Sequence, residues 1–287
     1  MGTKRVGFIG LGAMGLPMAR NLLRNGFELH VAGPRSPGSV EALKKEGAYT
    51  HAFLSDMISH CDVLITILPE DREIKEVLLS PAVLGGLRSG SLLIEMTSGS
   101  PEMMKRVHAA YQEKQILVLD APVSGGTAGA EKGTLTVMAG GTSEVLERAR
   151  PVLEAMAQNI FLVGSVGAGK AIKAINQMLA GIHMIAAAEA LALAEKLDID
   201  IEMLKEVIGK SSGASWMLLN KSNSISTRDF SLGFKHRLMK KDMQIAAAEG
   251  ADLTLPLATL ALQLYKMSER DCGEQDFSAI SKFILAE

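Results

Sequence analysis

Two lysines in the segment GSVGAGKAIKAINQ, residues 164–177, have spacings that could support chemistry. Gly164, Gly169 and Lys170 match a phosphate-binding loop, in which the lysine contacts a nucleoside triphosphate. Such a loop also needs a serine or threonine after its lysine to hold Mg²⁺, whereas Ala171 follows Lys170. We therefore expect the match to be accidental, and a triphosphate-using enzyme is the weakest interpretation of the chain.

The second lysine, Lys173, lies three and four residues before Asn176 and Gln177, which is the spacing of one polar face of a helix. A neighbouring apolar face is expected to be buried and comprises Ile172, Ile175, Leu179 and Ile182. Its burial would hold Lys173 at the junction between two domains. A lysine held in this way can act as a general acid or base. This requires a pKa below the free value of about 10.4, lowered by desolvation and by a nearby positive charge.

A glycine pattern near the N-terminus, GFIGLGAMGLPMARNLL, predicts a dinucleotide site. Gly10, Gly12 and Gly15 follow an apolar strand and precede a helix, the context in which Gly-x-Gly-x-x-Gly binds a pyrophosphate. The first glycine allows a tight turn, the second lets the backbone approach the pyrophosphate, and the third lets helix and strand pack closely. Ala13 and Met14 complete the loop at the helix N-terminus, where backbone N–H groups face the anion.

The segment ELHVAGPRSPGS, at the end of the second expected strand, favours NADP over NAD. An NAD site usually places an acid there for the ribose 2′-hydroxyl, and an NADP site places an arginine near the extra phosphate. No acidic residue lies between Glu28 and Glu41, and Arg35 and Ser36 follow the strand. We expect these two residues to bind the 2′-phosphate; the alternative is that Arg35 is a solvated loop residue.

The wider sequence supplies the elements that would position these residues. Short apolar runs alternate with amphipathic helical stretches in the first half of the chain, which predicts a parallel sheet covered by helices. The runs are RVGFIG, FELHVA, DVLITIL, SLLIEM and ILVLDAP. After about Gly164 the sequence becomes long helical patterns rich in Ala, Leu and Met. The expected fold class is α/β, with a Rossmann dinucleotide-binding domain over residues 1–164 and an all-helical substrate and dimerisation domain over residues 165–287.

The segment DAPVSGG, residues 120–126, resembles an anion site at the end of a strand. Ser124 offers a hydroxyl, and Gly125 and Gly126 offer backbone N–H groups unobstructed by side chains, a plausible nest for a carboxylate. A flexible loop without function is the alternative. Combined with Lys173 and a nicotinamide, the nest predicts hydride transfer at the hydroxyl-bearing carbon of a short hydroxy acid, without a metal.

Four motifs in the same order resemble the β-hydroxyacid dehydrogenases, a family that includes 3-hydroxyisobutyrate dehydrogenase and tartronate semialdehyde reductase. The motifs are GFIGLGAMGLPMARNLL, DAPVSGGTAGAEKGTLTVMAGG, GAGKAIKAINQ and FKHRLMKKDMQIA, and they extend over almost the whole chain. The stretch INQMLAGIHMIAAAEALALA further resembles the branch that acts on four-carbon sugar acids such as L-threonate.

The resemblance implies a role for each matching position. Lys173 is implied to be catalytic. The implied substrate-binding residues are Ser124, Gly125, Gly126, Asn176, Gln177 and Asp242. The implied cofactor contacts beyond the glycine loop are Leu68, Pro69, Ser98 and Lys241. Two departures leave geometry open: Thr97-Ser98 stands where the family has Ser-Thr, and GPRS has one residue more than the usual segment, so the exact place of Arg35 is open.

Composition restricts the class of partner. The 30 basic and 32 acidic residues give a formal net charge of −2 without charge runs, which does not suggest a nucleic-acid track or a membrane-surface patch. The two cysteines lack metal-ligand spacing. The segment MGTKRVGFIG leads directly into the glycine motif, so we do not expect it to be a targeting segment. We therefore expect a cytoplasmic protein. The large helical region predicts a homodimer or homotetramer. A non-catalytic dinucleotide-binding sensor on the same fold remains the alternative function.

Overall fold

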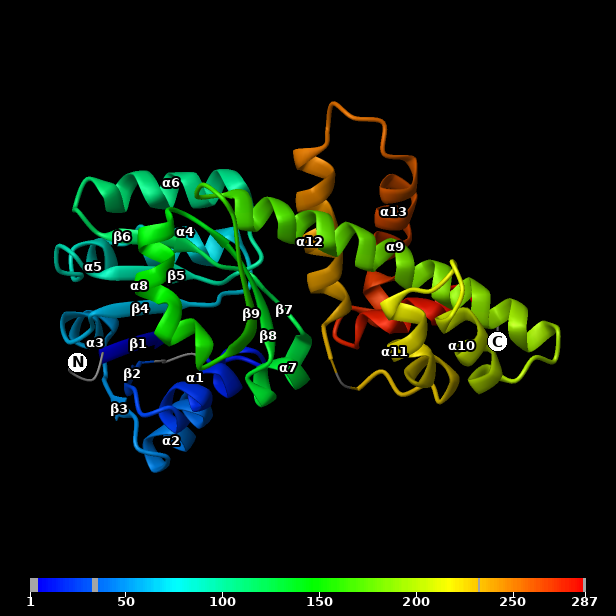
Figure 1. Cartoon of the computed structure of the whole chain (residues 1–287), viewed down its shortest axis with the longest axis horizontal. Coiled ribbons are helices and arrows are strands. Elements are labelled where there is room, and N and C mark those ends of the chain that lie inside the picture. Colours follow the sequence, from blue (N-terminus) through cyan, green and yellow to red (C-terminus); the bar gives the residue numbers. More distant parts are fainter. Residues whose placement is uncertain (1–4, 33–35, 232, 286–287) are drawn as a thin grey trace. The chain divides into compact units, whose positions relative to one another are not determined.

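A computed structural model describes residues 5–32, 36–231 and 233–285. The chain forms two compact units, Met1–Lys173 and Ala174–Glu287 (Figure 1). The division falls inside the long helix α9 (Ala168–Lys196), which begins in the first unit and continues through the second.

The first unit is built on one sheet, to which the described residues contribute nine strands. Its strand order is β3–β2–β1–β4–β5–β6–β8–β7, and β9 also pairs with β8. The parallel strands are β1 (Arg5–Ile9), β2 (Glu28–Val31), β3 (Tyr49–Thr50), β4 (Val63–Thr66), β5 (Leu92–Glu95) and β6 (Leu117–Asp120). The five apolar runs of the sequence therefore form parallel strands as expected. Strands β1 to β3 are added toward one edge of the sheet, and β4 to β6 are added from β1 toward the other edge. The order of the strands therefore reverses between β1 and β4, and open α/β sheets bind ligands at such a point.

The remaining strands correct the expectation of a wholly parallel sheet. They are β7 (Val123–Ser124), β8 (Leu135–Gly140) and β9 (Ala157–Gly164). Strand β8 runs antiparallel to both β6 and β7, and β9 runs parallel to β8. The sheet is mixed because the short connection through α7 (Gly126–Lys132) returns the chain alongside β6 in the opposite direction.

Helices cover both faces of this sheet. They are α1 (Gly15–Arg24), α2 (Pro37–Lys45), α3 (Leu54–Ser59), α4 (Asp71–Leu78), α5 (Pro81–Leu84), α6 (Pro101–Gln112), α7 (Gly126–Lys132) and α8 (Ser143–Glu154). One core packs α1, α2, α7 and α8 against the sheet, and a second core packs α3 to α6 against it. Because both faces are covered, β4 and β5 are buried at every position, and they are apolar except at their last residues, Thr66 and Glu95.

The second unit is helical in its described residues, as expected. After α9 come α10 (Ile201–Gly209), α11 (Trp216–Ser226), α12 (His236–Glu249), α13 (Pro256–Cys272) and the 3₁₀ helix η1 (Phe277–Phe283). Their shared core includes Met184, Leu191, Met239 and Tyr265. Helix α9 is long and apolar enough to cross a membrane by length and composition alone, but half of its most apolar window is buried inside the protein.

The faces of α9 are oriented differently from the sequence expectation. Ile172, Ile175 and Leu179 are 40%, 51% and 46% exposed, whereas Lys173 and Gln177 are buried. Small residues explain the difference, because Ala180 and Gly181 let this side of the helix approach its neighbours closely. A Cβ at Gly181 would lie 2.4 Å from the sulfur of Met243 on α12. The expected burial is therefore wrong for Ile172, Ile175 and Leu179, whereas the fourth residue of the face, Ile182, is partly buried against the helical core.

Candidate active site

The glycine loop joins β1 to α1 at the point where the strand order reverses. Gly10 has φ of +101°, and a Cβ there would lie 2.0 Å from the carbonyl oxygen of Ile67, which follows β4. A Cβ on Gly15 would lie 1.8 Å from the carbonyl oxygen of Gly10. These two glycines therefore close the turn and pack helix against strand.

Gly12 differs from both neighbours in the motif. It is exposed, and a Cβ there would meet no protein atom within 4 Å. The fold itself therefore has no need of a glycine at this position, and the open space suits a ligand that approaches the backbone. Met14, the N-cap residue of α1, provides no side-chain hydrogen bond, which leaves the first backbone N–H groups of the helix available to an anion. The loop residues present fit a dinucleotide.

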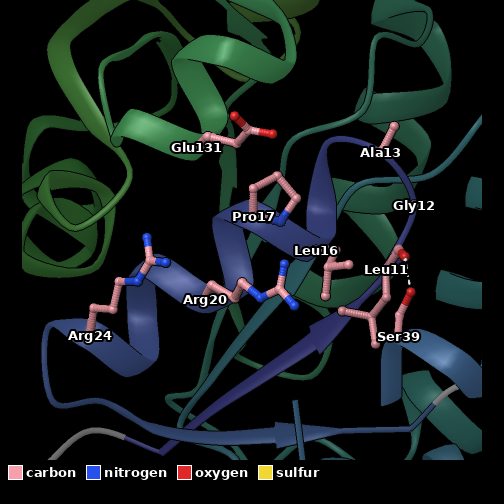
Figure 2. A pocket seen from close by; sticks show the side chains of 9 residues that line it. All are labelled: Leu11, Gly12, Ala13, Leu16, Pro17, Arg20, Arg24, Ser39 and Glu131. Atoms are coloured by element: carbon pink, nitrogen blue, oxygen red, sulfur yellow. Dashed lines mark hydrogen bonds between the residues drawn. The ribbon is translucent and has the colours of Figure 1, made fainter. Parts of the chain in front are cut away.

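A pocket of about 620 Å³ opens beside this loop (Figure 2). Its lining comes from the loop, from α1, from α2 and from α7: Leu11, Gly12, Ala13, Leu16, Pro17, Arg20, Arg24, Ser39 and Glu131. Ser39 donates a hydrogen bond to the carbonyl oxygen of Leu11 at 3.0 Å, which attaches the first turn of α2 to the loop. Three of the lining residues, Leu11, Gly12 and Ala13, belong to the glycine loop, so a ligand bound at the loop would border this pocket.

The carboxyl ends of β4 and β5 carry the next expected cofactor residues. Leu68 and Pro69 follow β4, and Ser98 follows β5 in the neighbouring loop. The backbone N–H of Leu68 donates to Thr97 Oγ1 at 2.8 Å, so the two loops are joined directly. Thr97 is buried and takes this structural bond, whereas Ser98 is partly exposed at the same edge of the sheet.

The carboxyl end of β2 bears on the choice between NAD and NADP. Glu28, the acid nearest to this end on β2, lies at the start of the strand and contacts His30 Nε2 at 2.9 Å. Ser36 is the N-cap residue of α2, while Arg35 lies outside the described residues. In the described part of this segment, no carboxylate follows the strand before Glu41 in α2.

The Ser-Gly-Gly segment lies at the N-terminus of α7. Ser124 ends β7, Gly125 is the N-cap residue with φ of +132°, and Gly126 begins the helix with φ of +62°. Both glycines are exposed and adopt conformations that other residues rarely reach. Exposed N–H groups beside a hydroxyl form an arrangement that can bind a carboxylate.

The apparent phosphate loop is a strand-to-helix turn closed around a carboxylate. Asp120 Oδ2 accepts hydrogen bonds from the backbone N–H groups of Gly167 and Lys170 at 3.0 and 3.1 Å. A Cβ on Gly169 would lie 2.3 Å from the carbonyl oxygen of Met138. Asp120 thus occupies the position at the helix N-terminus that a phosphate would take, and the triphosphate interpretation is wrong.

Lys170 is enclosed by acidic residues. Its ammonium group contacts Glu95 Oε2 and lies 3.5 Å from Asp120 Oδ1, and all three side chains are completely buried. Burial raises the pKa of Asp120, an effect that the Lys170 ammonium opposes. Neither Glu95 nor Asp120 was expected from the sequence to have a function. One signal was available, since each is an acid that ends an apolar strand, and they are register partners on β5 and β6.

The helical unit brings together three of the expected substrate residues and Lys241. Asn176 donates from Nδ2 to Gln177 Oε1 at 3.0 Å, and Gln177 donates from Nε2 to Asp242 Oδ2 at 2.7 Å. Lys241 Nζ lies 2.8 Å from Asp242 Oδ1. Lys173 precedes these amides by one turn on α9. Among the described residues, no group of three or more His, Cys, Asp or Glu side chains could hold a metal ion.

Comparison with known proteins decides the family. The sequence model of the NAD binding domain of 6-phosphogluconate dehydrogenase matches residues 5–164, and that of the NAD-binding region of NADP-dependent 3-hydroxyisobutyrate dehydrogenase matches residues 167–284. An NAD-dependent L-serine dehydrogenase from Pseudomonas aeruginosa is 39% identical, with 97% of each chain covered. The chain belongs to the β-hydroxyacid dehydrogenase family.

Other members of the β-hydroxyacid dehydrogenase family show similar agreement. A 2-(hydroxymethyl)glutarate dehydrogenase from Eubacterium barkeri is 38% identical, covering 97% of this chain and 94% of the relative. The solved structure of 3-hydroxyisobutyrate dehydrogenase from Mycobacterium tuberculosis with L-serine has a TM-score of 0.91 at 34% identity, covering 99% of this chain and all of the other. The chain is an NAD(P)-dependent hydroxyacid dehydrogenase with a small hydroxy acid as substrate, and the sensor alternative is set aside.

Proposed function

We propose that this dehydrogenase moves a hydride between NADP and the hydroxyl-bearing carbon of a short β-hydroxy acid, with Lys173 as the general acid or base. The observation that carries the proposal is the environment of Lys170. Its ammonium is held by the buried carboxylates of Glu95 and Asp120, so it is unsuited to take a proton from a substrate. Lys173, the lysine of the family signature, is the remaining candidate in the GAGKAIK segment.

Each proposed role follows from what the side chains can do. The hydroxyl of Ser124 and the N–H groups of Gly125 and Gly126 bind the substrate carboxylate. Neutral Lys173 takes the proton of the alcohol during oxidation, and its ammonium returns a proton during reduction. Asn176, Gln177 and Asp242 orient the substrate, as the family resemblance implies. The bound dinucleotide supplies the hydride acceptor or donor.

NADP is proposed as the preferred cofactor, contacted by Arg35 and Ser36. The support is the missing acid at the carboxyl end of β2, together with the engagement of Glu28 by His30 at the other end of that strand. One relative carries the name NAD-dependent L-serine dehydrogenase, so the preference has to be measured with both cofactors. The other proposed cofactor contacts are the glycine loop, Leu68, Pro69, Ser98 and Lys241.

The relatives narrow the proposed substrate. L-serine, 3-hydroxyisobutyrate and 2-(hydroxymethyl)glutarate, named for three relatives, all carry a hydroxymethyl group on the carbon next to a carboxylate. We therefore propose an acid of this kind. The test is to measure initial rates of dinucleotide reduction with such acids, with L-threonate, and with the 2-hydroxy acids lactate and malate as controls. Turnover of the hydroxymethyl acids supports the proposal, whereas turnover of the controls alone would contradict it.

We also propose a homodimer or homotetramer in a reducing, cytoplasmic environment. Exposed apolar side chains along α13 support self-association: Leu257, Leu260 and Met267 are 65%, 60% and 62% exposed. Cys61 and Cys272 are buried free thiols, which suits a reducing compartment. Analytical ultracentrifugation tests the oligomeric state, and a sedimenting monomer at micromolar concentration would contradict it.

A further inference from the structure

Lys170 connects three parts of the first unit. Its ammonium donates to the side chain and the backbone carbonyl of Glu95 and to the carbonyl oxygen of Thr97. Its own backbone N–H donates to Asp120 Oδ2. The lysine thus joins the end of β5, the loop after it and the end of β6 to the first turn of α9.

Glu95 extends this network to the cofactor loops. Glu95 Oε1 accepts from the backbone N–H of Thr97 at 3.1 Å and from Thr66 Oγ1, at the end of β4, at 3.4 Å. Thr97 Oγ1 in turn accepts from the N–H of Leu68 at 2.8 Å. The loop that carries Leu68 and the loop that carries Ser98 are therefore fixed through the partner of Lys170.

The other carboxylate fixes the helix that bears Lys173. Asp120 caps α9 by accepting the N–H groups of Gly167, just before the helix, and of Lys170 in its first turn, and Lys173 follows Lys170 by one turn. One ammonium between two completely buried carboxylates is a costly arrangement, because apolar residues of similar size at all three positions would avoid the desolvation of three charges. Fixed geometry is the advantage that such a network can provide.

We propose that Lys170 is a positioning residue for the dehydrogenase reaction, holding the cofactor loops after β4 and β5 in register with the first turn of α9. The part that concerns turnover rests on the proposed role of Lys173. The part that concerns cofactor binding does not, because it can be measured without a substrate.

The experiment compares Lys170→Met, Lys170→Met/Glu95→Gln and Lys170→Arg with the wild type. Lys114→Met, at an exposed lysine after α6, is the matched control. The Kd values for NADPH and NADH are measured by nicotinamide fluorescence at a temperature where circular dichroism shows each variant folded. Tm is measured at pH 5.5 and pH 8.5, and kcat and KM are measured with the best hydroxy acid.

Lys170→Met should raise the Kd of the reduced cofactor and lower kcat, each by about 10- to 100-fold, because a misplacement of about 1 Å can lower a rate by about 100-fold. Its loss of Tm should be greater at pH 8.5 than at pH 5.5. Without the ammonium the two buried carboxylates are uncompensated when charged. Burial raises the pKa of Asp120, so protonation of this carboxylate at lower pH removes part of that penalty. The double variant should regain part of the Tm, because the Glu95 charge is gone while Asp120 keeps its backbone N–H partners, but it should not regain cofactor affinity.

A wild-type Kd in folded Lys170→Met, or parallel recovery of Tm and Kd in the double variant, would overturn the proposal, because Lys170 would then only balance charge. If Lys170→Met does not fold, the folded double variant decides. Wild-type cofactor affinity in the double variant would then overturn the proposal. A wild-type enzyme that binds cofactor but oxidises none of the proposed acids would count against the proposed substrate and leave the affinity result valid.

Discussion

Gln177 on α9 donates a 2.7 Å hydrogen bond from its side-chain amide to the buried carboxylate of Asp242 on α12. Asp242 is also the partner of Lys241, its neighbour in sequence. These two substrate-binding candidates, 65 positions apart in the sequence, are therefore one structural pair.

Gln177→Ala should lower kcat/KM for the hydroxy acid by about 10- to 100-fold, which corresponds to the ~1.5–3 kcal/mol of a hydrogen bond to a charged group. The Kd for NADPH should stay unchanged, because Gln177 is assigned to the substrate. Gln244→Ala, at an exposed glutamine on α12, is the control. A parallel loss of cofactor affinity would assign this pair to the dinucleotide site instead.

Gly12 and Gly15 should respond to alanine in opposite ways. Gly12→Ala should keep the wild-type Tm, since no protein atom lies near the added Cβ, but should weaken NADP(H) binding at least about tenfold by blocking the pyrophosphate. Gly15→Ala should lower the free energy of unfolding by about 1–3 kcal/mol, because its Cβ would collide with the carbonyl of Gly10. Thermal unfolding and cofactor titration of both variants check this. Wild-type cofactor affinity in Gly12→Ala would place the dinucleotide elsewhere.

Arg35→Ala should weaken NADP far more than NAD. Only NADP carries the 2′-phosphate, and a charge-assisted hydrogen bond to it contributes about 1.5–3 kcal/mol, or roughly 10- to 150-fold in Kd. Isothermal titration with each cofactor measures the ratio. Equal losses for both cofactors would remove Arg35 from the phosphate site.

His236 should make the helical unit sensitive to acid. It is buried on α12, contacts Ser268 Oγ at 2.9 Å, and burial lowers its pKa to about 4. Since the unfolded chain binds this proton near pH 6.5, stability is fully present above that pH and falls as pH drops towards 4. The expected loss between pH 7 and pH 5 is about 2 kcal/mol.

The comparison for this prediction is His236→Gln, which keeps a side-chain donor but cannot titrate. Urea unfolding at both pH values should show a smaller loss for the variant than for the wild type. Equal losses would mean that His236 does not contribute to the acid sensitivity.

Local patterns were sufficient to predict the glycine loop and the five apolar parallel strands, because both depend on neighbours in sequence. They did not predict β8 and β9. The pairing of these strands depends on where the chain returns to the sheet, which the spacing of neighbouring residues does not determine. The orientation of α9 failed for a similar reason, since exposure of Ile175 depends on which side of the helix finds partners. The Lys170–Glu95 contact joins residues 75 positions apart. The sequence therefore allowed the expectation that Lys170 is no triphosphate ligand, but not the identification of its partners.

The most direct test of the central claim is the rate of hydroxy acid oxidation by Lys173→Ala as a function of pH and of added ethylamine, with NADP(H) binding measured separately. In the wild type, oxidation should rise with pH, because only the neutral amine is a base, while reduction should be lost as pH rises. Lys173→Ala should bind NADP(H) normally and have a kcat about 10²–10⁴-fold lower. It should lose the pH dependence and recover activity with ethylamine.

Two further variants serve as comparisons. Lys173→Arg should also be nearly inactive, since a guanidinium stays charged, and Lys170→Met should not respond to ethylamine. Near-normal turnover by Lys173→Ala, without added amine, would contradict the assignment of Lys173 as the general acid or base.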